Sequence, residues 1–519
     1  MRLTLFDPKK LKELGAGADV EDERAYPVVK SGYWWNDPGL LKLNLHLVWP
    51  MFSQFVEGYD GSLTNNLQAL TVWETYFDHP EGSILGLINA VFFLGSMIAP
   101  FIMPWVSDRF GRRACLQIGC ILSILGAALL TGANGRSLYI AGRFFLGMGN
   151  TFISIGPVLV AELAYPHHRS VCTALSNAGY SAGSIVAAWV CFGTLHVNNN
   201  WAWRIPCLVQ IPFSVVQMIG VFFMPDSPRW YIAKDRESEA LDILIKYHGN
   251  GDANDEIVNM EFEEIVQTLA LEKSHGKVDL KNVLSTRGNW WRLFCLTWAG
   301  MCYQLSGNGL VSYYLNSMLT TAGITSETVK VLISATSQIF SFICSVSFAF
   351  LPGIFGRRRL ILVSLALMFI DFVILTATVG VFKHNGSKSA SYANIAFIYL
   401  YSGVHNLGFV GAIIVFLTEI LPYNLRATGI SYFSFIKGAS STINTYVNPV
   451  GMAAIGWKFY FVYVGWIAFE WIVVYITFPE TKGLALEEVA VIFDGEDAII
   501  HVNQRAALEK ATVDYVETA

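Results

Sequence analysis

Charged residues are scarce in this chain of 519 residues: 14% are Asp, Glu, Lys or Arg, whereas 53% are hydrophobic and 14% are aromatic. A soluble domain carries about 25% charged residues, so this composition excludes an ordinary soluble protein. The first 43 residues are polar and contain no apolar core of the signal-peptide type, so nothing in them predicts a cleaved targeting segment.

Signs of enzymatic, metal or nucleotide chemistry are lacking as well. The Gly-rich run from Gly142 to Gly149 falls inside a predicted helix, where small residues allow close packing, and it does not indicate a nucleotide-binding loop. All eight cysteines fall in or at the ends of predicted spans, which favours apolar packing over a disulfide framework or a metal site. We therefore expect no enzyme activity, no cofactor, no metal and no nucleic-acid partner.

Long apolar stretches are what the chain has in quantity. Each is about 20 residues long, enough to cross a hydrocarbon core of about 30 Å. They lie near 45–66, 84–106, 115–133, 138–163, 172–195, 204–224, 291–314, 328–351, 359–382, 394–420, 428–453 and 458–478. The sequence thus predicts an all-α membrane protein with twelve transmembrane helices in two pseudo-symmetric six-helix bundles, and we expect it to be a monomer in the bilayer.

Lys and Arg cluster between alternate pairs of spans, which predicts a multi-pass plasma membrane protein with both termini cytoplasmic. The sequon at Asn385 falls on the outer side, and its glycosylation is left open. The expected divisions are an N-terminal segment (1–43), a first bundle (44–224), a cytoplasmic linker (225–290), a second bundle (291–480) and a tail (481–519). Within the linker we expect a short amphipathic helix over 239–247 and a solvated acidic stretch from Asp252 to Glu264.

Charged motifs of the cytoplasmic loops occur twice, in the same order and at nearly the same offset. Asp108 to Arg113 returns as Ile354 to Arg359, and Glu162, with Arg169 seven positions later, returns as Glu419 with Arg426. Two similar membrane halves are typical of a transporter. We expect these residues to form a cytoplasmic latch that holds the outward-facing state and separates in the inward-facing one: Asp108, Arg112, Arg113, Glu162, Arg169, Arg229, Arg357, Arg358, Glu419, Arg426 and Glu480.

Two opposite charges occur at matched depth in the first half. Asp60 and Arg143 each lie about 22 Å from the cytoplasmic ends of their helices. Buried charges need partners. The pair has two interpretations: a static ion pair between helices, or a carboxylate whose proton occupancy makes and breaks the pair.

Neutral polar residues within the spans indicate the cargo. Amides both donate and accept, which suits vicinal hydroxyls, and aromatic rings suit the apolar face of a sugar ring. Gln304 and Asn308, four residues apart, should share one helix face, and Asn177 should reach the same cavity from the other half. Lys437, near mid-membrane, has two interpretations: it lines the cavity or extends to the cytoplasmic face. The candidate substrate residues are Asn177, Tyr303, Gln304, Asn308, Tyr313, Gln338, Ser341 and Lys437.

Three further motifs are Gly142-Arg143-Phe144, Pro225 to Trp230 and Pro479 to Gly483. With them, the chain resembles the sugar porter family of the major facilitator superfamily over about residues 45–490. The resemblance implies that Asp60 couples proton to sugar with Arg143 as its partner. Within the family the chain looks most like the fungal lactose-permease and cellodextrin-transporter branch. Tyr303 stands where hexose carriers have Gln, and Asn177 stands at another usual Gln position. Gly353 replaces an expected Asp, and Lys437 replaces a frequent Asn.

The sequence therefore predicts a proton-coupled importer of a disaccharide or oligosaccharide such as lactose or cellobiose. Two alternatives stay open: a proton-independent hexose or pentose uniporter, and a non-transporting sugar receptor.

Overall fold

The computed structural model describes residues 34–274, 286–348, 351–410, 412–421, 423–482 and 486–494, and a few side chains within these ranges, that of Arg426 among them, lie outside the description. The first half of the chain forms six membrane helices. They are α2 (Pro38–Leu67), α4 (Gly82–Phe110), α5 (Arg112–Thr131), α6 (Arg136–Ile153) continued by α7 (Gly156–Leu163), α8 (Arg169–Thr194) and α9 (Trp201–Phe223). Three short elements accompany them: η1 (Trp34–Asn36), α3 (Thr71–Tyr76) and η2 (Pro166–His168).

The second half repeats this arrangement. Its six membrane helices are α14 (Arg287–Leu305) continued by α15 (Asn308–Tyr313), α17 (Glu327–Phe348), α19 (Arg357–Asn385), α20 (Lys388–His405) continued by η3 (Asn406–Val410) and α21 (Ala412–Ile420), α22 (Tyr423–Ile455) and α23 (Tyr460–Thr477). The short elements are α16 (Leu315–Thr321), α18 (Leu351–Phe355), η4 (Gly456–Phe459) and α24 (Leu486–Asp494). Twelve membrane helices, as predicted, are thus present in the described residues.

The described residues of the linker between the halves contain three helices: α10 (Pro228–Ala233), α11 (Glu237–Tyr247) and α12 (Glu256–Ser274). The amphipathic helix predicted over 239–247 is confirmed as part of α11. The expectation of a solvated acidic stretch was wrong for Glu261, which is 1% exposed. Its carboxylate binds Arg169 at 3.1 Å and His248 at 2.6 Å, contacts that local composition does not reveal.

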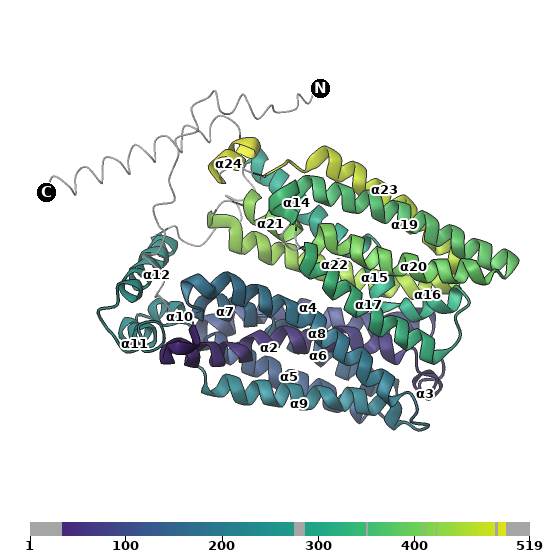
Figure 1. Cartoon of the computed structure of the whole chain (residues 1–519), viewed down its shortest axis with the longest axis horizontal. Helices are drawn as coiled ribbons and strands as arrows, with labels where there is room; N and C mark the ends of the chain where they lie inside the picture. The colour runs from purple at the N-terminus through teal and green to yellow at the C-terminus, as the bar shows by residue number, and fades with distance from the viewer. Residues whose placement is uncertain are drawn as a thin grey trace.

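Figure 1 shows the two bundles one above the other, with α10 to α12 and α24 gathered at the left end. We call this end the linker end; it is the predicted cytoplasmic face. The bundles meet along α4 with α22 and along α8 with α17.

Small residues allow α5 and α6 to pack closely. A Cβ atom at Gly142 on α6 would lie 2.9 Å from the carbonyl oxygen of Gly126 on α5. The glycine run from 142 to 149 therefore serves helix contact, as predicted.

The membrane helices are not equally apolar. Eight stretches within the described residues are long and apolar enough to cross a membrane, and one of them, Thr428–Thr477, covers both α22 and α23. The membrane helices not included are α2, α8 and α14 with α15. Their lower hydropathy has a local cause, because polar side chains near the bundle interface interrupt their apolar sequence.

Candidate functional site

Hydrogen bonds between the bundles concentrate at the end away from the linker. At mid-height Thr442 Oγ1 lies 3.4 Å from Met97 Sδ. The other inter-bundle bonds among the described residues are Asn316 Nδ2 to Gln68 O (2.5 Å), Gln68 Nε2 to Tyr313 O (3.3 Å), Ser334 Oγ to Asn66 Oδ1 (2.6 Å), Asn89 Nδ2 to Tyr314 Oη (3.0 Å) and Thr71 Oγ1 to Glu327. Polar contacts thus close the molecule opposite the linker end.

Asp60 and Arg143 are both buried, at 1% and 5% exposure, but no ion pair joins them in the described part of the chain. Neither carboxyl oxygen of Asp60 has a hydrogen-bond partner there. The Arg143 guanidinium instead lies 4.6 Å from the centre of the Phe92 ring. The two groups form no direct salt bridge in the described residues, but they lie within electrostatic reach of each other. The role of Arg143 as the partner of Asp60 stays a prediction, and cation–π attraction to Phe92 also holds the guanidinium.

Glu57 and Lys437 bring opposite charges to the interface from opposite bundles. Glu57 lies on α2, one turn before Asp60, accepts a hydrogen bond from Gln54 Nε2 at 3.0 Å and lies within electrostatic reach of Lys437. Lys437, on α22, places Nζ 4.9 Å from the centre of the Tyr303 ring on α14. The Lys437 amine therefore stays at mid-membrane height and does not extend to the cytoplasmic face.

Tyrosine hydroxyls surround the same point. Tyr180 on α8, Tyr303 and Tyr313 interact electrostatically with one another, and Glu57 acts on Tyr180 and Tyr313. The Tyr313 ring also contacts Phe93 of the first bundle, with centres 5.3 Å apart. Sequence reasoning missed Glu57 and Tyr180. The signal for Glu57 was its place one helical turn from Asp60.

The seventh membrane helix (helix seven), which consists of α14 and α15, does not present Gln304 and Asn308 as one continuous face. Gly307, with φ of 105°, separates α14 from α15, so the expected i to i+4 relation is wrong. Gln304 is buried, and its side-chain oxygen has no hydrogen-bond partner among the described residues. Asn308 is half-buried and accepts a hydrogen bond from Ser312 Oγ at 2.9 Å. Because of this break, the side-chain directions of Gln304 and Asn308 are set separately.

The remaining candidate substrate residues differ in their surroundings. Asn177 is exposed on α8, three residues from Tyr180 and thus on the same side of the helix. Gln338 is half-buried on α17. Ser341 Oγ accepts a hydrogen bond from Asn406 Nδ2 at 2.8 Å, which engages it inside the second bundle. Ser341 is therefore the candidate with the least freedom to bind cargo.

The repeated motif at the linker end has a definite structure in the first half. The Asp226 carboxylate accepts hydrogen bonds from the backbone N–H groups of Arg112 and Arg113, at 3.2 and 3.3 Å, and so caps the start of α5. Burial raises the pKa of Asp226, and these N–H groups oppose that rise. Arg112 pairs with Glu162 at 3.2 Å. Gly111, with φ of 96°, lets the carboxylate approach, because a Cβ there would lie 2.0 Å from Asp226 Oδ2.

The second half repeats this structure with one difference, since its second backbone donor is the third residue after the glycine and not the second. Glu480 accepts hydrogen bonds from the backbone N–H groups of Arg357 and Arg359, at 3.0 and 3.4 Å, at the start of α19. Arg357 pairs with Glu419 at 2.6 Å. Arg113 and Arg358 correspond too, since their guanidinium groups donate to the backbone oxygens of Phe222 and Tyr475. Each cluster holds its own bundle together.

The predicted latch differs from these contacts in two respects. Glu162 pairs with Arg112, whereas Arg169 pairs with Glu261 of the linker. The Arg112–Glu162 and Arg357–Glu419 pairs each lie within one bundle, and none of the ion pairs in the described residues joins the two bundles. The expectation that such pairs separate between the outward-facing and the inward-facing state stays a prediction. Asp108 is exposed and Arg229 half-buried on α10, and the side chain of Arg426 lies outside the description.

We expect Glu162→Gln and Glu419→Gln each to slow turnover by about 5- to 30-fold, since each removes a charge-assisted bond worth roughly 1–2 kcal/mol. Substrate affinity should stay unchanged, because neither residue lies near Lys437 or Tyr303. Initial uptake rates and equilibrium binding, measured side by side, check this. Arg236→Gln, which removes an exposed pair with Glu239, is the control and should change neither quantity. Normal turnover with weakened binding would contradict the assignment.

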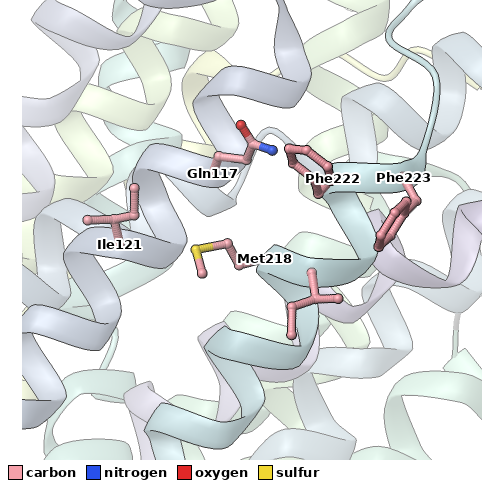
Figure 2. A pocket seen from close by; sticks show the side chains of 6 residues that line it. Gln117, Ile121, Met218, Phe222 and Phe223 are labelled. Carbon is pink, nitrogen blue, oxygen red and sulfur yellow. The ribbon is translucent and has the colours of Figure 1, made fainter.

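The groove in Figure 2 lies apart from these residues. It measures about 400 Å³ and is lined by side chains of α5 and α9: Gln117, Ile121, Met218, Ile219, Phe222 and Phe223. Phe222 and Phe223 are 60% and 71% exposed. Large exposed apolar side chains on membrane helices suit contact with lipid, so we do not assign this groove to the functional site.

Comparison with known proteins fits this arrangement. A family model described as "Sugar (and other) transporter" matches residues 47–493. The chain is 28% identical over 460 residues to a high-affinity glucose transporter of Kluyveromyces lactis, covering 83% of this chain and 81% of the relative. It is 27% identical over 455 residues to the high glucose sensor RGT2 of Saccharomyces cerevisiae, covering 85% of this chain and 59% of the sensor.

Among solved structures, the inward open conformation of the xylose transporter XylE from E. coli superposes with a TM-score of 0.71 at 18% identity, covering 87% of this chain and 100% of that one. The chain shares this fold. The two relatives named above are a glucose transporter and a glucose sensor, so a place in the lactose-permease branch stays a prediction.

Proposed function

Because the chain belongs to the sugar transporter family, whose members are not enzymes, we propose that it imports a sugar together with a proton by alternating access of its two bundles. The proposed cargo is a neutral disaccharide or oligosaccharide such as lactose or cellobiose. The observation that carries the proposal is Asp60, a buried carboxyl group whose oxygens have no hydrogen-bond partner among the described residues, within electrostatic reach of Arg143 and one turn from Glu57 at the interface. An intramembrane carboxyl group in such surroundings is costly to ionise, which suits a group that gains and loses a proton.

The proposed binding site combines both bundles. Tyr180, Asn177 and Glu57 would contact the sugar from the first bundle, and Tyr303, Gln304 and Asn308 from the second. Hydroxyl and amide groups match sugar hydroxyls in both donor and acceptor roles. Tyr303, where hexose carriers have Gln, supports a wider cargo than glucose.

The proposed topology places the linker end in the cytoplasm, with both termini on that side and the protein in the plasma membrane as a monomer. Arginine-rich loops at the linker end support this orientation. The state shown, closed opposite the linker, is then inward-facing, in agreement with the likeness to the inward open conformation of XylE.

A sugar receptor is the second candidate, favoured by the relative named as a glucose sensor. The two candidates separate in one experiment. Yeast lacking its own sugar transporters and expressing this chain should accumulate labelled lactose or cellobiose, and uptake should increase as the external pH falls. Uptake of glucose alone would overturn the disaccharide cargo, uptake independent of pH would favour the uniporter, and binding without uptake would favour the receptor.

We expect Lys437→Asn to change sugar preference by about 5-fold or more while leaving folding intact, because the amine lies against Tyr303 within reach of Glu57. The measurement is competition of labelled lactose by a panel of sugars. Lys458→Asn, in η4 directly after the C-terminal end of α22, is the matched control and should leave preference unchanged. An unaltered order of competitors would remove Lys437 from the binding site.

A further inference from the structure

The break in the seventh membrane helix, between α14 and α15, is held by a buried acid on α23. Ser306 and Gly307 separate α14 from α15, and a Cβ atom at Gly307 would lie 2.3 Å from the Phe372 ring. Ser306 Oγ lies 2.6 Å from Glu470 Oε2 on α23 and 2.5 Å from the carbonyl oxygen of Cys302. Ser306 is therefore fixed between two oxygens at the point where the helix changes direction.

The number of hydrogen atoms available at Ser306 indicates whether the Glu470 carboxyl group is protonated. A serine hydroxyl has one hydrogen, and the Cys302 carbonyl can only accept it. If Ser306 donates to Cys302 O, the short contact with Glu470 needs a proton on Oε2, donated to Ser306 Oγ. If Glu470 were ionised, it would take the Ser306 hydrogen, and two oxygens 2.5 Å apart would face each other without one. The geometry is that of a protonated carboxylic acid.

The surroundings of Glu470 agree with a neutral acid. Its side chain is 0% exposed, and its other oxygen accepts a hydrogen bond from Trp466 Nε1 at 2.7 Å. No Lys, Arg or His forms an ion pair with it in the described ranges. The titratable groups around it are Cys302 of α14, whose thiol also forms a hydrogen bond with Glu470, Tyr401 of α20, Tyr463 of α23 and, beyond Tyr401, Asp371 of α19. A buried anion without a cation is costly, and none of these groups is a cation at neutral pH.

We propose that Glu470 is a proton-carrying positioning residue, which donates a hydrogen bond to Ser306 and fixes the break of helix seven. When the proton leaves to water, Ser306 turns its only hydrogen to the carboxylate, and the last turn of α14 loses its bond to Cys302. Gln304 stands on that turn, so the orientation of its amide follows the proton on Glu470. This role rests on the proposed function only in that Gln304 is taken to bind the sugar.

The protonation state of Glu470 can be measured without a transport assay. Infrared difference spectra of the purified protein in lipid nanodiscs, recorded between wild type and Glu470→Gln at neutral pH, should contain a carbonyl band of a protonated carboxylic acid that the variant lacks and that shifts in D2O. Asp371→Asn identifies the band of the neighbouring acid and should leave that of Glu470 in place. If the Glu470→Gln variant lacks carboxylate bands of the wild type, and not the carbonyl band of a protonated acid, the proposal is overturned.

Sugar binding then tests the positioning role. An amide at 470 can donate to Ser306 and accept from Trp466, so Glu470→Gln should bind within about twofold of wild type at pH 6 and keep that affinity at pH 9, where wild type should lose about 5- to 30-fold. Ser306→Ala should also remove this pH response, and the double variant should show no further change. A full pH response in either single variant would overturn the positioning role. If no sugar binds wild type while the acid band is present, the proposed function fails and the protonated Glu470 stands.

Discussion

Asp60→Asn is expected to abolish uphill sugar accumulation while leaving sugar exchange between the two sides of the membrane. An asparagine resembles the protonated acid permanently, so the bundles can still rock but no proton is carried. A one-unit pH gradient stores about 1.4 kcal/mol per proton, enough for about tenfold accumulation with one proton per sugar. In proteoliposomes with such a gradient, wild type should approach this ratio, and the variant should stop at equal concentrations.

Asp371→Asn is the matched control for this prediction. Asp371 is also 1% exposed with no hydrogen bond to either carboxyl oxygen in the described part of the chain, but it lies inside the second bundle on α19, away from Arg143. The control should accumulate sugar as wild type does. Accumulation by Asp60→Asn with a normal pH dependence would remove Asp60 from the coupling mechanism.

Gln304→Ala should weaken sugar binding by about 5- to 150-fold at acid and neutral pH, which corresponds to roughly 1–3 kcal/mol. The Gln304 side chain is 4% exposed and its oxygen has no protein partner among the described residues, so a sugar hydroxyl is the group that would satisfy it. Loss of the amide leaves that hydroxyl desolvated and unbound. Isothermal titration with the transported sugar at two pH values measures the effect and separates it from the pH-specific effect of Asp60→Asn.

Gln217→Ala controls for the loss of a buried amide as such. Gln217 is 0% exposed on α9, and its Nε2 donates to Ser53 Oγ at 2.8 Å inside the first bundle. Its removal should lower thermal stability without changing sugar affinity. Equal losses of affinity in both variants would show that Gln304 acts through stability alone.

The fold was within reach of sequence reasoning because two signals were strong. Twelve apolar stretches predicted the membrane helices, and the repeated charged motifs predicted the two similar halves. The motifs also had a local structural cause: Gly111 and Gly356 both take positive φ so that a carboxylate, Asp226 or Glu480, can cap the helix that follows. This helix cap depends on a few neighbouring residues and one distant carboxylate, so it can be recognised as a motif in the sequence.

The details of the site were harder to predict because they depend on side-chain direction. Depth along a helix placed Asp60 and Arg143 at one level, and the two groups lie within electrostatic reach of each other, but the contact of the guanidinium with Phe92 from a third helix could not be predicted. The turn at Gly307 changes the helix face of Asn308, although the glycine itself was noticed as weakening the helix. Glu470 had no visible partner in sequence, since Ser306 lies 164 positions away.

The most direct test of proton-coupled sugar transport is the proton flux that sugar itself drives. Purified protein is reconstituted into liposomes without a pH gradient, and lactose or cellobiose is added outside while external pH and sugar uptake are recorded together. We expect the medium to become more alkaline as sugar enters, and Asp60→Asn to take up sugar without this change. Sugar entry through the wild-type protein at constant external pH would contradict it.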